Sequence, residues 1–127
     1  MIAALLLAAA AVQPADKDDD PIETACLERD YSQQAMNRCA GEAYQRADAA
    51  LNAQWKKVLD TYGDDAEAKK LLLDGQRAWL KYRDSWCEIA ALDSVGGSIW
   101  PLINSGCLAS LTRARTQELK VLLEGEQ

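Results

Sequence analysis

The chain is 127 residues long, which is the size of one compact domain. Hydrophobic residues make up 49% and charged residues 27%, a balance typical of globular proteins and not of disordered or membrane-embedded chains. The formal net charge of −6 excludes nucleic acid as an expected partner and suits a basic protein instead. Because the sequence contains no histidine, Ser-His-Asp and Cys-His catalytic systems are excluded as well.

The N-terminal residues are typical of an export signal. Residues 1–12 are all apolar, yet they are too few to span a bilayer, which takes about 20 residues. The alternative, a buried N-terminal helix, fits poorly with the proline and the acidic run that follow. No cysteine precedes Cys26, so we expect no lipid anchor, no stable membrane anchor after signal removal, and a periplasmic or secreted protein. The expected divisions are a signal peptide at 1–15, an acidic linker at 16–21 and a helical domain at 22–124.

The composition downstream favours helices, because Val, Ile and Thr are sparse, Phe is absent, and Ala, Leu, Gln, Glu, Lys and Arg dominate. Residues 21–30 can form a short helix that carries Cys26. Ser32 is a suitable N-cap for a longer helix, in which apolar or small residues recur every three or four positions as far as Tyr62. Gly63 and the two aspartates after it end this helix and start the next.

A second long helix is expected from about Asp65 to Leu92, antiparallel to the first because their connection is short. Residues 94–98 form a turn, and a third helix is expected to begin near Asn104 or Ser105. One stripe of the second helix is expected to face the core, with a ligand cage as the alternative role of its aromatic residues; it contains Ala68, Leu72, Gly75, Trp79, Tyr82, Trp86 and Ile89. The predicted fold is all-α, a small antiparallel three-helix bundle with a short extra N-terminal helix.

Four cysteines in a short exported chain favour disulfides, and without histidine or Cys-x-x-Cys spacing we expect no metal and no cofactor. Folding the long helices about residue 63 brings Cys39 to the height of Cys87, and Cys107 arrives at the same end. Three pairings remain open from the sequence. Local pairing is the one we expect, with two disulfides, Cys26–Cys39 and Cys87–Cys107.

The order and spacing of several short motifs resemble the LprI-type lysozyme-inhibitor family of exported bacterial proteins. The resemblance covers about Cys26 to Leu122 and is carried by Cys26, Met36-Asn37, Cys39-Ala40, Ala47-Asp48, Leu51-Asn52, Gln76-Arg77-Ala78-Trp79, Tyr82-Arg83-Asp84, Cys87, Gly96-Gly97-Ser98, Cys107, Thr112, Arg115-Thr116 and Leu119. It departs at Trp55, where the pattern favours tyrosine. The resemblance implies a secreted helical domain that inhibits lysozyme or a similar basic cell-wall hydrolase. The alternative is a structural or assembly module of the cell envelope that binds another periplasmic protein.

Two groups of residues are candidates for specific roles, and neither is expected to be catalytic, so we expect a protein-binding domain and not an enzyme. The polar residues of the family pattern are expected to form a structural network; they are Asp48, Asn52, Gln76, Arg83 and Arg115. The loop residues Gly96, Gly97, Ser98 and Trp100 are the candidate partner-binding site. The alternative is that the glycines only turn the chain and Trp100 plugs the end of the bundle.

Overall fold

The computed structural model describes residues 20–125. Within that range it contains helices and no strand, which confirms the predicted all-α fold. The elements are α1 (Pro21–Arg29), α2 (Gln33–Tyr62), α3 (Ala66–Ala90), the 3-10 turn η1 (Leu92–Ser94) and α4 (Trp100–Glu124). The predicted signal peptide and nearly all of the predicted linker lie outside the described residues.

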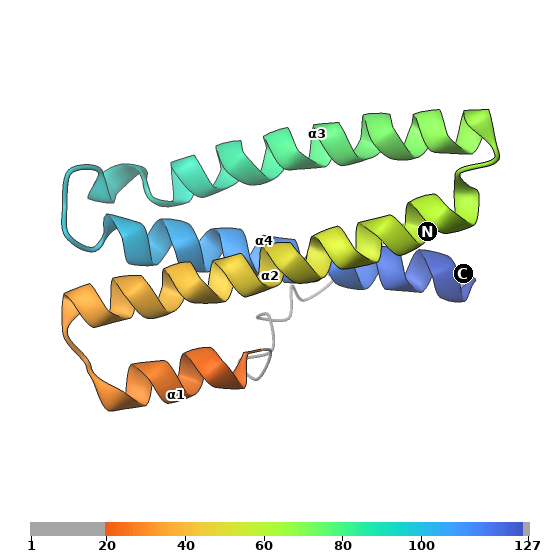
Figure 1. Ribbon diagram of the computed structural model, residues 1–127. Helices are drawn as coiled ribbons and strands as arrows, with labels where there is room; N and C mark the ends of the chain where they lie inside the picture. The colour runs from red at the N-terminus through yellow and green to blue at the C-terminus, as the bar shows by residue number, and fades with distance from the viewer. Residues whose placement is uncertain (1–19, 126–127) are drawn as a thin grey trace, which may run out of the picture.

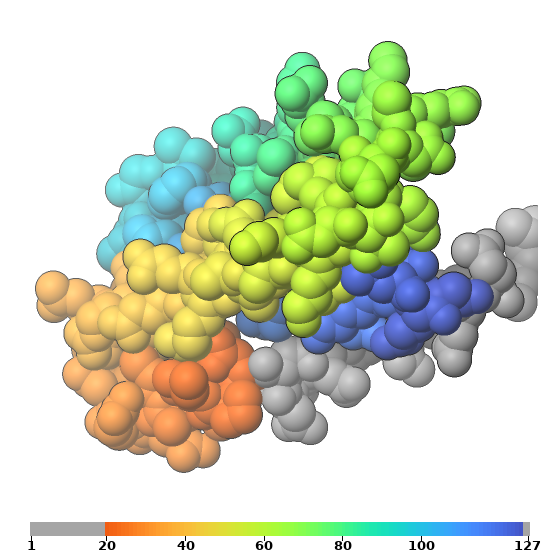
Figure 2. All heavy atoms as spheres, turned by 45° about the vertical axis from the view of Figure 1, so that its right-hand side comes forward, coloured from red at the N-terminus to blue at the C-terminus, as the bar shows by residue number. Residues whose placement is uncertain are grey.

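The helices form three layers, with α2 and α4 in the middle (Figure 1). Helix α3 covers one side of this layer and runs antiparallel to α2, whereas α1 lies on the opposite side; the space-filling view in Figure 2 shows the same order. Helices α2 and α4 run in the same direction and make the most extensive contact in the molecule. This arrangement is the predicted bundle with its short additional helix.

Local signals set most of the helix boundaries. The Ser32 hydroxyl accepts a hydrogen bond from the amide of Ala35 at 3.2 Å and caps α2, as expected from the sequence. The Asp65 carboxylate caps α3 by accepting from the amides of Glu67 and Ala68, both at 3.0 Å. Both caps satisfy amide groups that have no partner within their own helix.

The predicted start of the last helix near Asn104 is wrong, because α4 begins at Trp100. Pro101 lies three residues before the predicted start. In the structure this proline stands in the first turn of α4, where its missing N–H costs no helical hydrogen bond and its fixed φ suits the helix. The helix therefore extends back over the apolar residues 100–103.

The core is narrow and consists largely of small residues. Along α2 the most deeply buried side chains include Ala35, Ala40 and Ala43, each at most 1% exposed. Larger side chains are buried in the C-terminal half of α2 and of α4, where Leu51, Val58 and Leu119 form the hydrophobic core cluster. Partly buried residues pack around this cluster; they are Trp55, Tyr62, Leu72, Trp79, Leu122 and Leu123.

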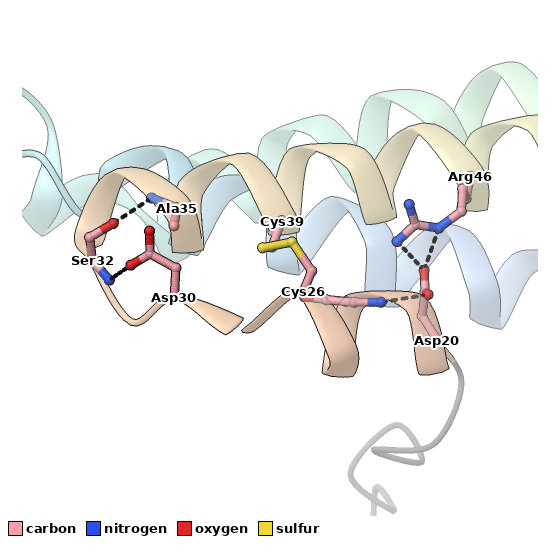
Figure 3. Close-up of a disulfide and its surroundings, with 8 residues drawn as sticks. Asp20, Cys26, Asp30, Ser32, Ala35, Cys39 and Arg46 are labelled. Atoms are coloured by element: carbon pink, nitrogen blue, oxygen red, sulfur yellow. Dashed lines mark hydrogen bonds and ion pairs between the residues drawn. A yellow bond between two sulfur atoms is a disulfide. The ribbon is translucent and has the colours of Figure 1, made fainter. Parts of the chain in front are cut away.

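Both predicted disulfides are confirmed. Cys26 of α1 is joined to Cys39 of α2 with a Cα–Cα distance of 5.8 Å, which fastens α1 to the middle layer (Figure 3). Cys87 of α3 is joined to Cys107 of α4 with a Cα–Cα distance of 5.6 Å. The second disulfide joins α3 to α4 and thereby closes the connection between them, which contains the loop.

Candidate functional site

The loop that carries the predicted partner-binding residues is anchored at several points. Its backbone turns through η1, and the amide of Gly97 donates to the carbonyl of Ser94 at 2.9 Å. Gly96 has a φ of +82°, a conformation that side chains with a Cβ rarely adopt. The side-chain amide of Asn37, near the start of α2, donates to the carbonyl of Ser98 at 2.8 Å. Together with the Cys87–Cys107 disulfide, these contacts hold the loop in one conformation.

The predicted loop residues differ in their exposure. Gly96, Gly97 and Ser98 are exposed, whereas Trp100 is partly buried as the first residue of α4. Ile99, immediately before Trp100, is also exposed. The loop therefore presents its backbone and an aliphatic side chain to solvent, whereas Trp100 is less accessible.

The expectation that the aromatic stripe of α3 is core is wrong for its C-terminal half. Tyr82, Trp86 and Ile89 have 52%, 53% and 60% of their surfaces exposed. The face of α3 that is buried contains Gln76, Arg83 and Cys87, so the apolar stripe is rotated to one flank of the helix. The rings of Tyr82 and Trp86 stack on this flank with their centroids 6.1 Å apart and an interplanar angle of 27°.

The exposed apolar side chains continue from α3 into the loop. We call the whole group the loop-end apolar surface; it consists of Tyr82, Trp86, Ile89, Leu92, Val95 and Ile99. The exposed acidic residues Glu88 and Asp93 lie among these positions in the chain. A group of large exposed apolar residues bordered by charge is typical of a protein-binding surface. The sequence carried no signal for this exposed flank, because its apolar residues recur with the period of a core-facing stripe.

Arg83 is the most deeply buried charged residue described, at 7% exposure. Its Nε donates to Oδ1 of Asp84 at 3.0 Å, and its Nη1 donates to the hydroxyl of Thr112 on α4 at 3.3 Å. The same Nη1 lies 3.9 Å from a carboxylate oxygen of Asp48 on α2. The guanidinium carbon lies 5.6 Å from the centre of the Tyr44 ring and 5.3 Å from that of Trp79. Arg83 thus links α3 to both helices of the middle layer.

Arg115 of α4 also binds α3, through Gln76. Its Nε donates to the side-chain oxygen of Gln76 at 2.9 Å, its Nη1 pairs with Glu118 at 2.9 Å, and its guanidinium carbon lies 5.7 Å from the Trp79 ring centre. The structure therefore brings together four of the five predicted polar residues around Trp79. Asn52 is exposed, and within residues 20–125 no hydrogen bond or ion pair joins it to this cluster.

The described residues contain no group of three or more His, Cys, Asp or Glu side chains placed to hold a metal ion. Among residues 20–125, no helix is both long enough and apolar enough to cross a membrane.

Comparisons with known proteins complete the description of the site. Residues 25–119 match the sequence model of a family described as "Lysozyme inhibitor LprI". The chain is 42% identical over 107 residues to an uncharacterized protein, R02472, of Rhizobium meliloti (strain 1021), covering 76% of this chain and 77% of that protein. It is 30% identical over 117 residues to an uncharacterized protein, YecT, of Escherichia coli (strain K12), covering 87% and 68%. No solved structure matches.

Proposed function

Because the chain belongs to the LprI family, we propose that it is an exported protein-binding domain that inhibits lysozyme or a similar cell-wall hydrolase. The domain acts by occupying a surface of its partner and carries out no reaction itself. It works in the periplasm or outside the cell, where its two disulfides are stable. The observation that carries the proposal is the loop-end apolar surface, which the fold leaves uncovered in the described residues.

The chemistry of this surface fits a basic partner. The stacked rings of Tyr82 and Trp86 offer a large apolar contact with few rotatable bonds, and aromatic residues of this kind dominate protein interfaces. Glu88 and Asp93, which follow Trp86 in the chain, are also exposed, and the chain as a whole carries a formal charge of −6. Complementary charge speeds the encounter with a basic hydrolase, whereas the apolar residues supply most of the affinity.

The disulfide-held loop reduces the entropic cost of binding. Gly96, Gly97 and Ser98 are exposed at the edge of the loop-end apolar surface, and the Cys87–Cys107 disulfide and the Asn37 hydrogen bond restrict them before a partner arrives. In this proposal the loop backbone approaches the partner closely while Tyr82 and Trp86 anchor the contact.

The proposal is tested by titrating the purified protein against lysozyme in a cell-wall lysis assay, with Trp86→Ala as the test variant. The wild-type chain is expected to suppress lysis at near-stoichiometric ratios, and Trp86→Ala to lose most of this inhibition while remaining folded. Leu71→Ala is the matched control, because Leu71 is an exposed residue of the same helix about 22 Å away. Undiminished lysis at a large molar excess of wild-type protein would count against lysozyme as the target and favour the envelope-module alternative.

A Trp100→Ala variant separates support from direct contact. If Trp100 holds the loop in place, its removal lowers the free energy of unfolding by roughly 3 kcal/mol or more. If it contacts the partner directly, stability changes little and inhibition is lost. Thermal unfolding and the lysis assay, measured on the same sample, distinguish the two.

A further inference from the structure

A regular stripe of apolar and small residues runs along the outer side of α3. Every member is exposed, and the members follow one another in steps of three and four residues. We call this stripe the α3 seam; it consists of Gly75, Ala78, Tyr82, Ser85 and Ile89. Its centre lies roughly 140° around the helix from the buried residues Gln76, Arg83 and Cys87, at about 100° per residue. Because α3 is an outer layer of the bundle, no other helix within residues 20–125 covers the seam (Figure 1).

The spacing of the α3 seam is that of a contact between two helices packed side by side. Steps of three and four average about 3.5 residues, the repeat that keeps one stripe of a helix facing its partner along its whole length. In such a pair, charged residues beside the seam determine the choice and orientation of the partner. One edge of the α3 seam carries charged, exposed residues at intervals of seven, namely Asp74, Lys81 and Glu88.

Two copies of α3 complement each other in size when they run antiparallel. In the register whose two-fold axis passes between positions 83 and 84, Tyr82 faces Ser85 of the other copy, and Ala78 faces Ile89. Each large side chain therefore meets a small one, which allows the two helices to approach closely. Because a two-fold axis relates the copies, each of these contacts occurs twice.

The position of Gly75 fits the same arrangement. Glycine destabilises the interior of a helix relative to alanine, and a Cβ at Gly75 would meet no atom within 4 Å. Packing within the single chain therefore does not require glycine here. In the antiparallel register Gly75 faces Leu92 of the other copy, an exposed side chain just after the end of α3. The absence of a side chain at Gly75 leaves room for it.

The charges beside the α3 seam match in this register as well. Lys81 of each copy faces Glu88 of the other, and among residues 20–125 neither side chain already makes an ion pair. Sliding one helix by seven residues in either direction would instead bring Lys81 against Lys81 or Glu88 against Glu88. Charge therefore selects the register that the side-chain sizes also favour.

We propose that two copies of the protein form an antiparallel dimer through the α3 seam, with Lys81 and Glu88 paired across it. The dimer covers Tyr82 and Ile89 of the loop-end apolar surface. Dimerisation does not depend on the inhibition of lysozyme, but its consequence rests on the proposed function. Since the same residues cannot contact a hydrolase and a second copy at once, self-association and hydrolase binding compete.

Sedimentation velocity of the purified protein over a range of concentrations tests the proposal. We expect a dimer with a dissociation constant on the order of 10 μM, because one pair of helices makes a small contact. Lys81→Glu and Glu88→Lys should each weaken the dimer about tenfold or more, since either change turns two attractions into repulsions. Lys69→Glu is the matched control, because Lys69 is exposed on α3 outside the seam and the net charge changes equally.

A mixture of the two charge variants gives the most specific result. Lys81→Glu and Glu88→Lys chains carry opposite charges at both facing positions, so together they should form a heterodimer about as stable as the wild-type dimer. Three results would each overturn the proposal: a wild-type monomer at all concentrations up to about 500 μM, undiminished dimers of both variants, or a mixture that does not recover the dimer.

Adding lysozyme to the wild-type dimer tests the competition separately. One-to-one complexes of lysozyme and the protein are expected to replace the dimer. A complex that still contains two paired copies of the chain would contradict the competition. If lysozyme forms no complex while the dimer persists, the proposed function fails and the dimer stands, so the two failures are distinguishable.

Discussion

Helix α2 meets its two long neighbours in different ways. Against α4 it packs closely, because its most deeply buried positions are mainly alanines that let two helices approach. Helix α3 makes little backbone contact with α2, and large side chains stand between them, among them Tyr44, Trp79 and Arg83. The α2–α4 contact is therefore a close packing of small side chains, whereas the α2–α3 contact is made by aromatic rings and a buried charge.

This difference explains why the candidate binding surface lies on α3. A helix held away from its neighbours by a few large inward-pointing groups buries only a narrow face. In α3 that face is occupied by Gln76, Arg83 and Cys87, so the adjacent apolar flank has no helix to cover it among the described residues. The tightly packed α2–α4 layer provides the rigidity, and α3 carries the exposed residues available to a partner.

The largest expected loss of stability comes from a substitution in the α2–α4 layer. Leu51→Ala is expected to lower the free energy of unfolding by about 3 kcal/mol, because Leu51 is 2% exposed within the buried cluster and its removal leaves a cavity. Leu71→Ala removes the same atoms from α3 at a position that is 66% exposed, and should change stability by less than about 0.5 kcal/mol. Chemical denaturation measures both. Similar losses of stability in the two variants would contradict the difference in burial between the α2–α4 layer and the exposed face of α3.

The Cys87–Cys107 disulfide is the covalent part of the α3 contact. Replacing both cysteines with alanine is expected to lower stability by about 3 kcal/mol, because the bridge closes a loop of 20 residues in the unfolded chain. Amide hydrogen exchange should accelerate most in the last turns of α3, while the α2–α4 contact keeps its protection. Uniform acceleration in α2 and α4 would instead show that the bundle opens as one unit.

Arg83 tests the polar part of the same contact. Arg83→Gln removes hydrogen bonds to Asp84 and Thr112 and the contacts with two aromatic rings, so we expect a loss of about 2 kcal/mol. Arg77→Gln is the matched control, since Arg77 is exposed on the same helix and should matter by less than about 0.5 kcal/mol. Equal stability of the two variants, measured by thermal unfolding, contradicts the role given to Arg83.

The smallest expected effect concerns α1 and depends on pH. Asp20→Asn removes the ion pair with Arg46 and should cost about 1 kcal/mol at neutral pH. Because folding lowers the pKa of Asp20, its charge stabilises the fold above the unfolded-state value of about 4, and this contribution disappears as pH falls through the folded pKa. Wild type and variant should therefore converge in acid. A difference that stays constant from neutral pH to about pH 2 would show that the ion pair is not its cause.

The sequence predicted the order of the helices, and it favoured the two disulfides that the structure contains without excluding the other pairings. Ser32 and Asp65 marked the starts of two helices, and Gly63 marked the turn that makes them antiparallel, because capping and turning depend on neighbours in the chain. Folding α2 and α3 back on each other places Cys39 and Cys107 at the same end of the bundle as Cys87, so this argument favoured disulfides but left their pairing open. The start of α4 was misplaced because proline is compatible both with a break and with the first turn of a helix.

The candidate site was only partly predictable. The loop at Gly96 and the polar residues around Trp79 could be singled out from the chain, but the exposure of Tyr82 and Trp86 could not. Along α3 two neighbouring stripes both recur every three or four residues, and the more apolar one was expected to face inward.

The amino-acid sequence by itself determined the order of the helices, the caps of α2 and α3 and the turn at Gly63, which follow from local geometry and chain connectivity. It favoured the two local cysteine pairs without excluding the other pairings. Only the tertiary structure decided which face of α3 is buried. Asp84 pairs with Arg83, and Asp48, Thr112, Tyr44 and Trp79 surround the rest of its guanidinium group. Arg115 binds Gln76, so two polar residues can occupy the inner face. Because those partners come from three different helices, the energy that turns Tyr82 and Trp86 outward exists only in the assembled bundle.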